Sequence, residues 1–157
     1  MGQRGYVDGE FEVEFPPFLI GTMGVRVAEV GELPSRIIDI NDDVDIDVDW
    51  SLTGPLQRFI CGSWDLDIYV ESIGPGPEFE LADVENIAVD PTGNGHYHHT
   101  IHVPAGTIPT HLEQNGKVDN DVVYKMVATV TYKDPAGRPG PIAGFTELPL
   151  MHFYKAE

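Results

Sequence analysis

Apolar and polar residues alternate with a period of two along most of the chain, which is the pattern of strands with one buried face. In residues 44–50, VDIDVDW, four apolar side chains alternate with Asp45, Asp47 and Asp49. The same alternation occurs in residues 10–15 (EFEVEF), 64–71 (WDLDIYVE), 96–103 (HYHHTIHV), 123–133 (VYKMVATVTYK) and 144–154 (GFTELPLMHFY). Each of these segments is predicted to be a strand.

Other segments give weaker patterns. Residues 22–30 alternate only loosely, and residues 78–89, EFELADVENIAV, fit either a strand or one helical turn because apolar residues also recur at intervals of three. Pro149 interrupts the last alternating segment and predicts an edge strand or a bulge there, since proline has no N–H to donate to a sheet.

Glycine and proline separate these segments at short intervals, which is typical of a sandwich or barrel. The sequence therefore predicts an all-β fold, an antiparallel β-sandwich with few or no helices. With 157 residues the chain is long enough to form its own core. We expect a single domain over residues 1–157, with residues 1–40 as an N-terminal strand or extension and residues 41–157 as the sandwich core.

The order of the strands resembles that of immunoglobulin and fibronectin type III domains. Trp64 lies early in its strand and Tyr124 enters the long strand of residues 123–133, as the tryptophan and tyrosine of such domains do. The resemblance covers roughly 110 residues and is one of fold alone, because Cys61 is the single cysteine and no paired cysteines exist. It implies an immunoglobulin-like sandwich and transfers no functional residue. From the alternation itself we expect Trp50 and Trp64 in the core.

Charge patterns predict which strands share a sheet. If residues 44–50 and 64–71 formed a hairpin, their aspartates would lie opposite one another, and like charges directly opposite are destabilising. We therefore expect the two strands in different sheets. An immunoglobulin-like order sets residues 64–71 beside residues 123–133, where Lys125 and Lys133 supply charges of opposite sign.

The net charge of −17 is unevenly distributed. Residues 1–90 hold 20 acidic side chains against 4 arginines, whereas residues 91–157 hold 6 acidic against 5 basic side chains. Phosphate binding needs clustered Lys or Arg, so a nucleic-acid partner is not expected. No apolar run is long enough to insert into a membrane. Solubility alone would also account for an acidic surface.

Acidic residues that alternate along two strands give the main functional hypothesis. They are Asp45, Asp47, Asp49, Glu10, Glu12 and Glu14. The first two strands of a sandwich often share a sheet, and the mutual repulsion of these carboxylates would then need a compensating cation. We therefore expect a non-enzymatic binding or structural assembly module, whose acidic face contacts a protein partner or a neighbouring subunit of a homo-oligomer.

The histidine-rich strand supports an alternative function. Period two places His96, His98 and His102 on one face, and an H-x-H pair on a strand recurs in zinc, copper and iron sites. The aspartate strand would have to run alongside to supply a third ligand. The competing interpretation is a polar face on which histidines pair with carboxylates. The alternative is thus a metal-binding protein or metal-dependent enzyme that holds a divalent metal, whereas the main hypothesis needs no cofactor.

Carbohydrate binding or adhesion through Trp50, Trp64 or Tyr69 is a third function open to a sandwich. The chain has no phosphate-binding glycine loop, no local Ser-His-Asp motif and no H-E-x-x-H motif, so we name no catalytic residue and expect that it is not an enzyme. A lone cysteine and the lack of a signal-peptide run predict a cytoplasmic protein, or one exported without a signal peptide.

Overall fold

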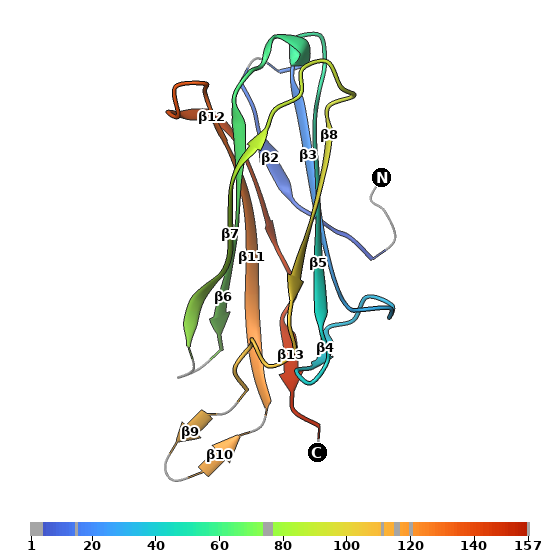
Figure 1. Ribbon diagram of the computed structural model, residues 1–157, viewed down its shortest axis with the longest axis vertical. Helices are drawn as coiled ribbons and strands as arrows, with labels where there is room; N and C mark the ends of the chain where they lie inside the picture. The colour runs from blue at the N-terminus through green and yellow to red at the C-terminus, as the bar shows by residue number, and fades with distance from the viewer. Residues whose placement is uncertain are drawn as a thin grey trace.

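The computed structural model describes residues 5–14, 16–73, 77–110, 112–114, 117–119 and 121–156. The described chain is all-β apart from one 3₁₀ turn, Gln57–Phe59. Two sheets enclose one hydrophobic core, which confirms the predicted β-sandwich (Figure 1). A short ribbon of β9 (Leu112–Gln114) and β10 (Lys117–Asp119) extends from one end.

The first sheet, here called the four-stranded sheet, has the order β1-β3-β5-β8. Its strands are β1 (Val7–Asp8), β3 (Ile20–Glu29), β5 (Val44–Thr53) and β8 (His96–Val103). All its pairings are antiparallel, and β5 lies between β3 and β8. Ile46 and Val48 of β5 are fully buried, so the aspartates that alternate with them lie on the outer face.

The second sheet, here called the seven-stranded sheet, is built around the long strand β11 (Asp121–Lys133). The other strands are β2 (Glu10–Glu12), β4 (Ile37–Asp39), β6 (Ser63–Ser72), β7 (Glu78–Ala88), β12 (Pro139–Glu147) and β13 (Met151–Tyr154). β6 pairs with one side of β11 and carries β7, while β12 and β13 share the other side. β4 is parallel to β13, and the remaining pairings are antiparallel.

Both tryptophans lie in the core, as predicted from their positions in the alternation. Trp50 is 2% exposed and Trp64 is 0% exposed. The ring of Trp64 makes edge contacts with Trp50, Tyr97 and Tyr132, with centroids 5.7 to 6.3 Å apart. These rings come from both sheets, so the aromatic cluster joins the two layers.

Both segments with weak patterns are strands. Residues 22–30 fall largely within β3, and residues 78–89 form β7 rather than a helical turn. The single strand predicted for residues 144–154 is wrong, because β12 and β13 are separated around Pro149. Both pieces still pair with β11, and the missing N–H of proline accounts for the break.

The aspartate strands lie in different sheets, as the charge argument predicted. β6 pairs with β11, and Lys133 Nζ lies 3.1 Å from Asp65 Oδ2. Lys125 lies opposite Glu71 but forms its ion pair with Glu147 of β12.

The shared sheet expected for the acidic strands β2 and β5 is wrong, because β2 pairs with β12 in the seven-stranded sheet. The chain crosses between the sheets at Gly9, where a Cβ would lie only 2.4 Å from the carbonyl oxygen of Phe145. Residues 1–40 thus contribute β1 and β3 to one sheet and β2 and β4 to the other. No helix in the described part of the chain is long and apolar enough to cross a membrane.

Candidate functional site

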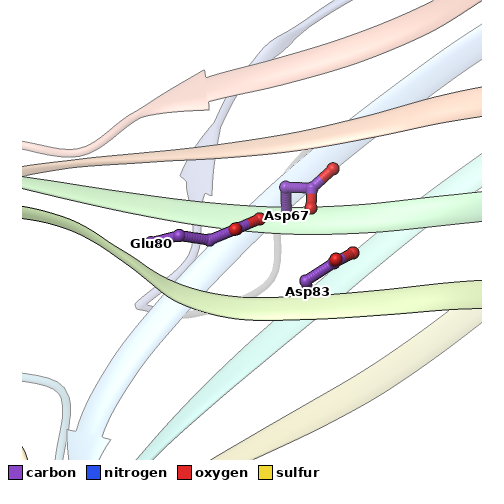
Figure 2. A group of neighbouring side chains, drawn as sticks. All are labelled: Asp67, Glu80 and Asp83. Carbon is purple, nitrogen blue, oxygen red and sulfur yellow. The ribbon is translucent and has the colours of Figure 1, made fainter.

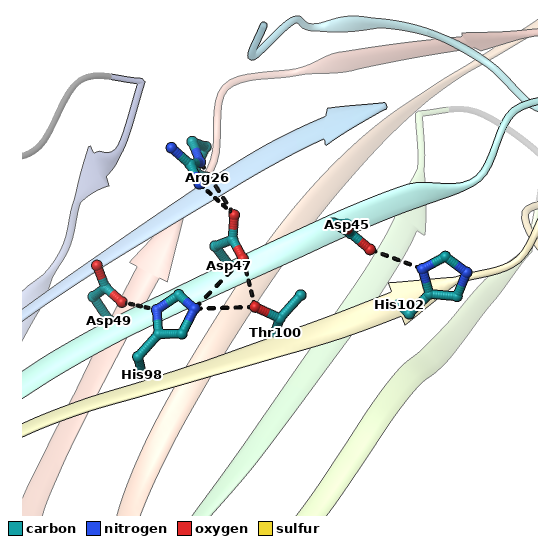
Figure 3. A network of polar contacts seen from close by, with 7 residues as sticks. All are labelled: Arg26, Asp45, Asp47, Asp49, His98, Thr100 and His102. Atoms are coloured by element: carbon teal, nitrogen blue, oxygen red, sulfur yellow. Dashed lines mark hydrogen bonds and ion pairs between the residues drawn. The ribbon is translucent and has the colours of Figure 1, made fainter. Parts of the chain in front are cut away.

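The outer face of the four-stranded sheet brings the predicted aspartates and histidines together. β8 runs beside β5, as the histidine hypotheses required. The opposed pairs are Asp45 with His102, Asp47 with Thr100, and Asp49 with His98. Their side chains therefore share one surface, shown in Figure 3.

His102 bridges two carboxylates. Its Nδ1 lies 2.8 Å from Asp45 Oδ1, and its Nε2 lies 3.3 Å from Asp43 Oδ2. Each nitrogen must carry a proton to donate to a carboxylate, so this geometry favours the charged imidazolium. The hydrogen bond with Asp45 accordingly raises the pKa of His102 above its ordinary value of 6.5, outweighing desolvation.

A second set of contacts links His98 to Arg26 through Asp47 (Figure 3). His98 contacts Asp49 through Nδ1, and its Nε2 lies 3.0 Å from Thr100 Oγ1. The Thr100 hydroxyl donates to Asp47 Oδ1 at 2.6 Å, and Arg26 donates to Oδ2 at 2.7 and 3.1 Å. Burial acts to raise the pKa of Asp47, but the hydrogen bonds from Thr100 and Arg26 outweigh it and hold the pKa below its ordinary value.

The chain thus supplies its own cations to this acidic row. Asp47 is held by an arginine, while Asp45 and Asp49 each lie against a histidine whose side chain is 53% exposed. The pKa of His102 is raised above 6.5, so the net charge of this face depends on pH near neutrality.

A groove of about 950 Å³ lies over the same outer face. Small residues of β3 and β5 are in its middle, and larger side chains near β1 and on β8 stand at its sides. The small residues are Thr22, Gly24 and Ser51, and the larger ones are Tyr6, His96 and His98. Asp8 and Asp49 also line it, so the groove is acidic and rich in hydrogen-bonding groups.

Tyr6 forms one side of the groove. The guanidinium carbon of Arg26 lies 4.9 Å from the centre of its ring, a cation–π contact. Burial and the neighbouring Asp49 carboxylate raise the pKa of Tyr6 to about 12. Its hydroxyl is therefore a proton donor at neutral pH.

The predicted metal ligands do not meet at one point. His96 lies opposite Ser51, while His98 contacts Asp49 and His102 contacts Asp45. Within the described residues, the one set of three His, Cys, Asp or Glu side chains with ligand atoms within 4.8 Å of one another is Asp67, Glu80 and Asp83. The metal hypothesis for the histidines stays a prediction. His111 lies outside the described residues.

The cluster of Asp67, Glu80 and Asp83 was not anticipated from the sequence (Figure 2). Asp67 on β6 lies opposite Asp83 on β7, and Glu80 is nearby on the same outer face. Burial, followed by hydrogen bonds with Glu80 and Asp83, raises the pKa of Asp67 to about 7. Oxygen ligands suit Ca²⁺ or Mg²⁺, but carboxyl groups that share protons also come this close without an ion.

The remaining predicted residues lie apart from this face. Glu10, Glu12 and Glu14 are exposed on or just after β2, in the other sheet. Trp50 and Trp64 are buried and closed to a sugar, whereas Tyr69 is 48% exposed on β6.

Comparisons with known proteins bear on the fold. No family model matches the sequence, and no curated protein matches it. Among solved structures, the crystal structure of the C-terminal domain of wzt is similar, with a TM-score of 0.55 and 8% sequence identity. The match covers 99% of this chain and 83% of that chain. At this identity the likeness is one of fold alone: the class is a two-sheet all-β sandwich, and the immunoglobulin resemblance holds only at that level.

Proposed function

We propose that this chain is a non-enzymatic binding or assembly module. The outer face of the four-stranded sheet would contact a basic surface, carried by a protein partner or by a neighbouring subunit. The observation that carries this proposal is the charge of that hollowed face. Among the described residues, its carboxylates include Asp8, Asp43, Asp45, Asp47 and Asp49, and the arginine that pairs with them is Arg26.

The fixed geometry of the face supports a binding role. β5 is paired on both sides, and the Arg26, Thr100 and histidine contacts hold its carboxylates in set directions. A surface that is ordered before binding loses little conformational entropy on binding. Electrostatic complementarity to a basic partner would add specificity and speed of association.

The hydroxyls of the groove support the absence of catalysis. A nucleophilic serine needs a base within hydrogen-bond reach. The Ser51 hydroxyl is instead bonded to the Thr22 hydroxyl, at 2.5 Å, although His96 lies across from Ser51 on β8. The Ser51 hydroxyl is therefore engaged by another hydroxyl, which favours a binding role over a nucleophilic one.

Binding of a labelled Lys- and Arg-rich peptide tests the proposal. The face variant replaces Asp8, Asp45 and Asp49 by Asn and keeps Asp47, which is the least exposed of the row. The control variant replaces Glu10, Glu12 and Glu85 by Gln and removes the same charge from exposed positions of the other sheet. We expect the face variant to bind about tenfold more weakly, and the control to bind nearly as the wild type.

Cooperative thermal unfolding of both variants is required, because it shows that each variant is folded and that their affinities can be compared. An equal loss of binding in the two variants would show that peptide affinity depends on the net charge of the whole chain. That result would overturn the proposal for this face.

The groove favours carbohydrate binding as a second candidate. A sugar offers apolar patches and hydroxyls, which suit an aromatic ring beside convergent polar groups. Tyr6 would supply the ring, and Asp49 and His98 the hydrogen bonds. An NMR titration with a panel of mono- and oligosaccharides tests this. Shifts centred on the groove, lost in Tyr6→Ala and kept in Tyr69→Ala, support it, whereas no shift for any sugar removes it.

A further inference from the structure

The two sheets have open edges that differ in protection. In the strand pairings of the described residues, β7 pairs with β6 alone and β8 pairs with β5 alone. An open edge presents unpaired N–H and C=O groups, which can pair with another chain unless charges or bulges prevent it.

The β7 edge has both kinds of protection. Glu78, Glu80, Asp83 and Glu85 are exposed along it. Its pairing with β6 also shifts register twice, so the strand is irregular. A second strand brought against β7 would meet a row of carboxylates on a kinked edge.

The β8 edge has no bulge and no carboxylate. Its eight residues, HYHHTIHV, include no Lys, Arg, Asp, Glu or Pro, and its register with β5 is unbroken. Its outer side chains are His96, His98, Thr100 and His102. Tyr97 and Ile101 on the inner side are only partly buried.

One hydrogen bond shows which backbone N–H and C=O groups of β8 point toward β5 and which point toward the open edge. The Leu52 N–H donates to the Gly95 carbonyl at 2.8 Å, just before β8 begins. Bonded and non-bonded pairs alternate in an antiparallel ladder, so Tyr97, His99 and Ile101 make the bonds to β5. The backbone N–H and C=O groups of the outward residues, Thr100 among them, therefore face the open edge.

We propose that β8 pairs antiparallel with β8 of a second copy of this chain, joining two four-stranded sheets into one continuous sheet across a two-fold axis. A two-fold contact requires an edge that is compatible with itself. β8 meets this condition because it carries no carboxylate and because His98 and His102 already lie against carboxylates of β5, whereas the carboxylates of β7 would repel their own copies.

The contact goes beyond the proposed function, since it uses the edge of the sheet rather than its face. It also completes the binding surface: the outer faces of both copies become one acidic surface with two contact sites. Two linked sites bind a partner that spans them more tightly than either alone.

Native mass spectrometry and sedimentation velocity over a range of protein concentrations at neutral pH test the proposal. We expect a dimer that Thr100→Pro and Thr100→Lys both convert to monomer. Proline at this position removes an N–H that faces the open edge and keeps the bonds to β5. Lysine charges the edge and has Asp47 of its own chain as a partner.

Glu85→Lys, which alters the charge of the β7 edge, is the matched control and should remain a dimer. A wild type that is monomeric at every concentration, or a dimer that survives both Thr100 substitutions, would overturn the proposal. Peptide binding by such a monomer would leave the proposed function intact, so the two can fail separately.

Discussion

At the scale of single residues, the partners of each carboxylate decide how it behaves. Asp47 is 13% exposed and held by Arg26, so it stays charged and mainly organises the face. Asp45 lies against His102, whose charge changes with pH. The hydrogen-bond partners of Asp67 are two other acidic side chains, Glu80 and Asp83. The three aspartates therefore contribute to stability in different ways.

His102→Gln should lower the melting temperature in mild acid and leave it nearly unchanged in base. The folded-state pKa of His102 is raised above 6.5, mainly by Asp45, so the protonated form favours folding. This stabilisation is fully present below pH 6.5 and is lost as pH rises through the raised value. Melting curves at pH 6 and pH 9 check it, with His96→Gln as control. An equal effect at both pH values would contradict it.

Asp67→Asn should raise the melting temperature at pH 8.5, and raise it clearly less at pH 5. Burial and its acidic neighbours raise the folded-state pKa of Asp67 to about 7 from an ordinary 3.8. Stability linked to this group is present below its ordinary value and is lost as pH rises through 7. The exposed Glu85→Gln serves as control, and a variant that is less stable at pH 8.5 would rule out repulsion at this cluster.

A chelator should leave the melting temperature unchanged at neutral pH. His102 lies between Asp43 and Asp45, which favour its protonated form, and a metal would compete with those protons. Thermal melts with and without EDTA make the measurement. A drop that zinc or copper reverses, and that His96→Ala or His98→Ala abolishes, would instead establish the metal site.

At the scale of elements, alternation predicted β5, β6 and β11, each of which buries one face completely or nearly so. It also predicted β8, whose inner face is only partly buried. For Pro149 it predicted an edge strand or a bulge, but not that the strand ends there and that the buried positions shift from Thr146 and Leu148 to Met151 and Phe153. Nor did it assign β2 to a sheet, because that depends on the crossing at Gly9 and on distant pairing with β12.

The acidic cluster escaped prediction for a related reason. Like charges that face each other argue against pairing β5 with β6, yet β6 and β7 pair with Asp67 opposite Asp83. The raised pKa of Asp67 favours its neutral form up to about pH 7, which reduces the repulsion at this pairing. A strand over residues 78–89 that pairs with β6 places Asp83 opposite Asp67, so the cluster could be predicted only once that pairing was known.

Ile46→Ala should cost about 2–5 kcal/mol in free energy of unfolding, as is usual for a buried isoleucine. Ile46 is fully buried on β5, the strand that holds the aspartate row. Ile20→Ala is the control, because Ile20 is 50% exposed on β3 and should change stability little. Urea denaturation measures both, and similar costs would contradict the burial assigned to β5.

At the scale of the whole molecule, the sandwich separates two acidic surfaces. One lies on the four-stranded sheet and contains its own arginine and histidines, and the other lies on β6 and β7 with three carboxylates clustered together. A charge of −17 alone would attract any cation to both. We propose that the hollowed and ordered geometry of the four-stranded sheet's outer face makes a basic partner bind to the first surface.

Hydrogen–deuterium exchange of the protein with a Lys- and Arg-rich peptide tests this claim most directly. Exchange should slow in β3, β5 and β8, and the effect should fade as salt shortens the Debye length from about 10 Å at 0.1 M to about 3 Å at 1 M. Protection confined to β6 and β7, or spread evenly over both sheets, would contradict the claim.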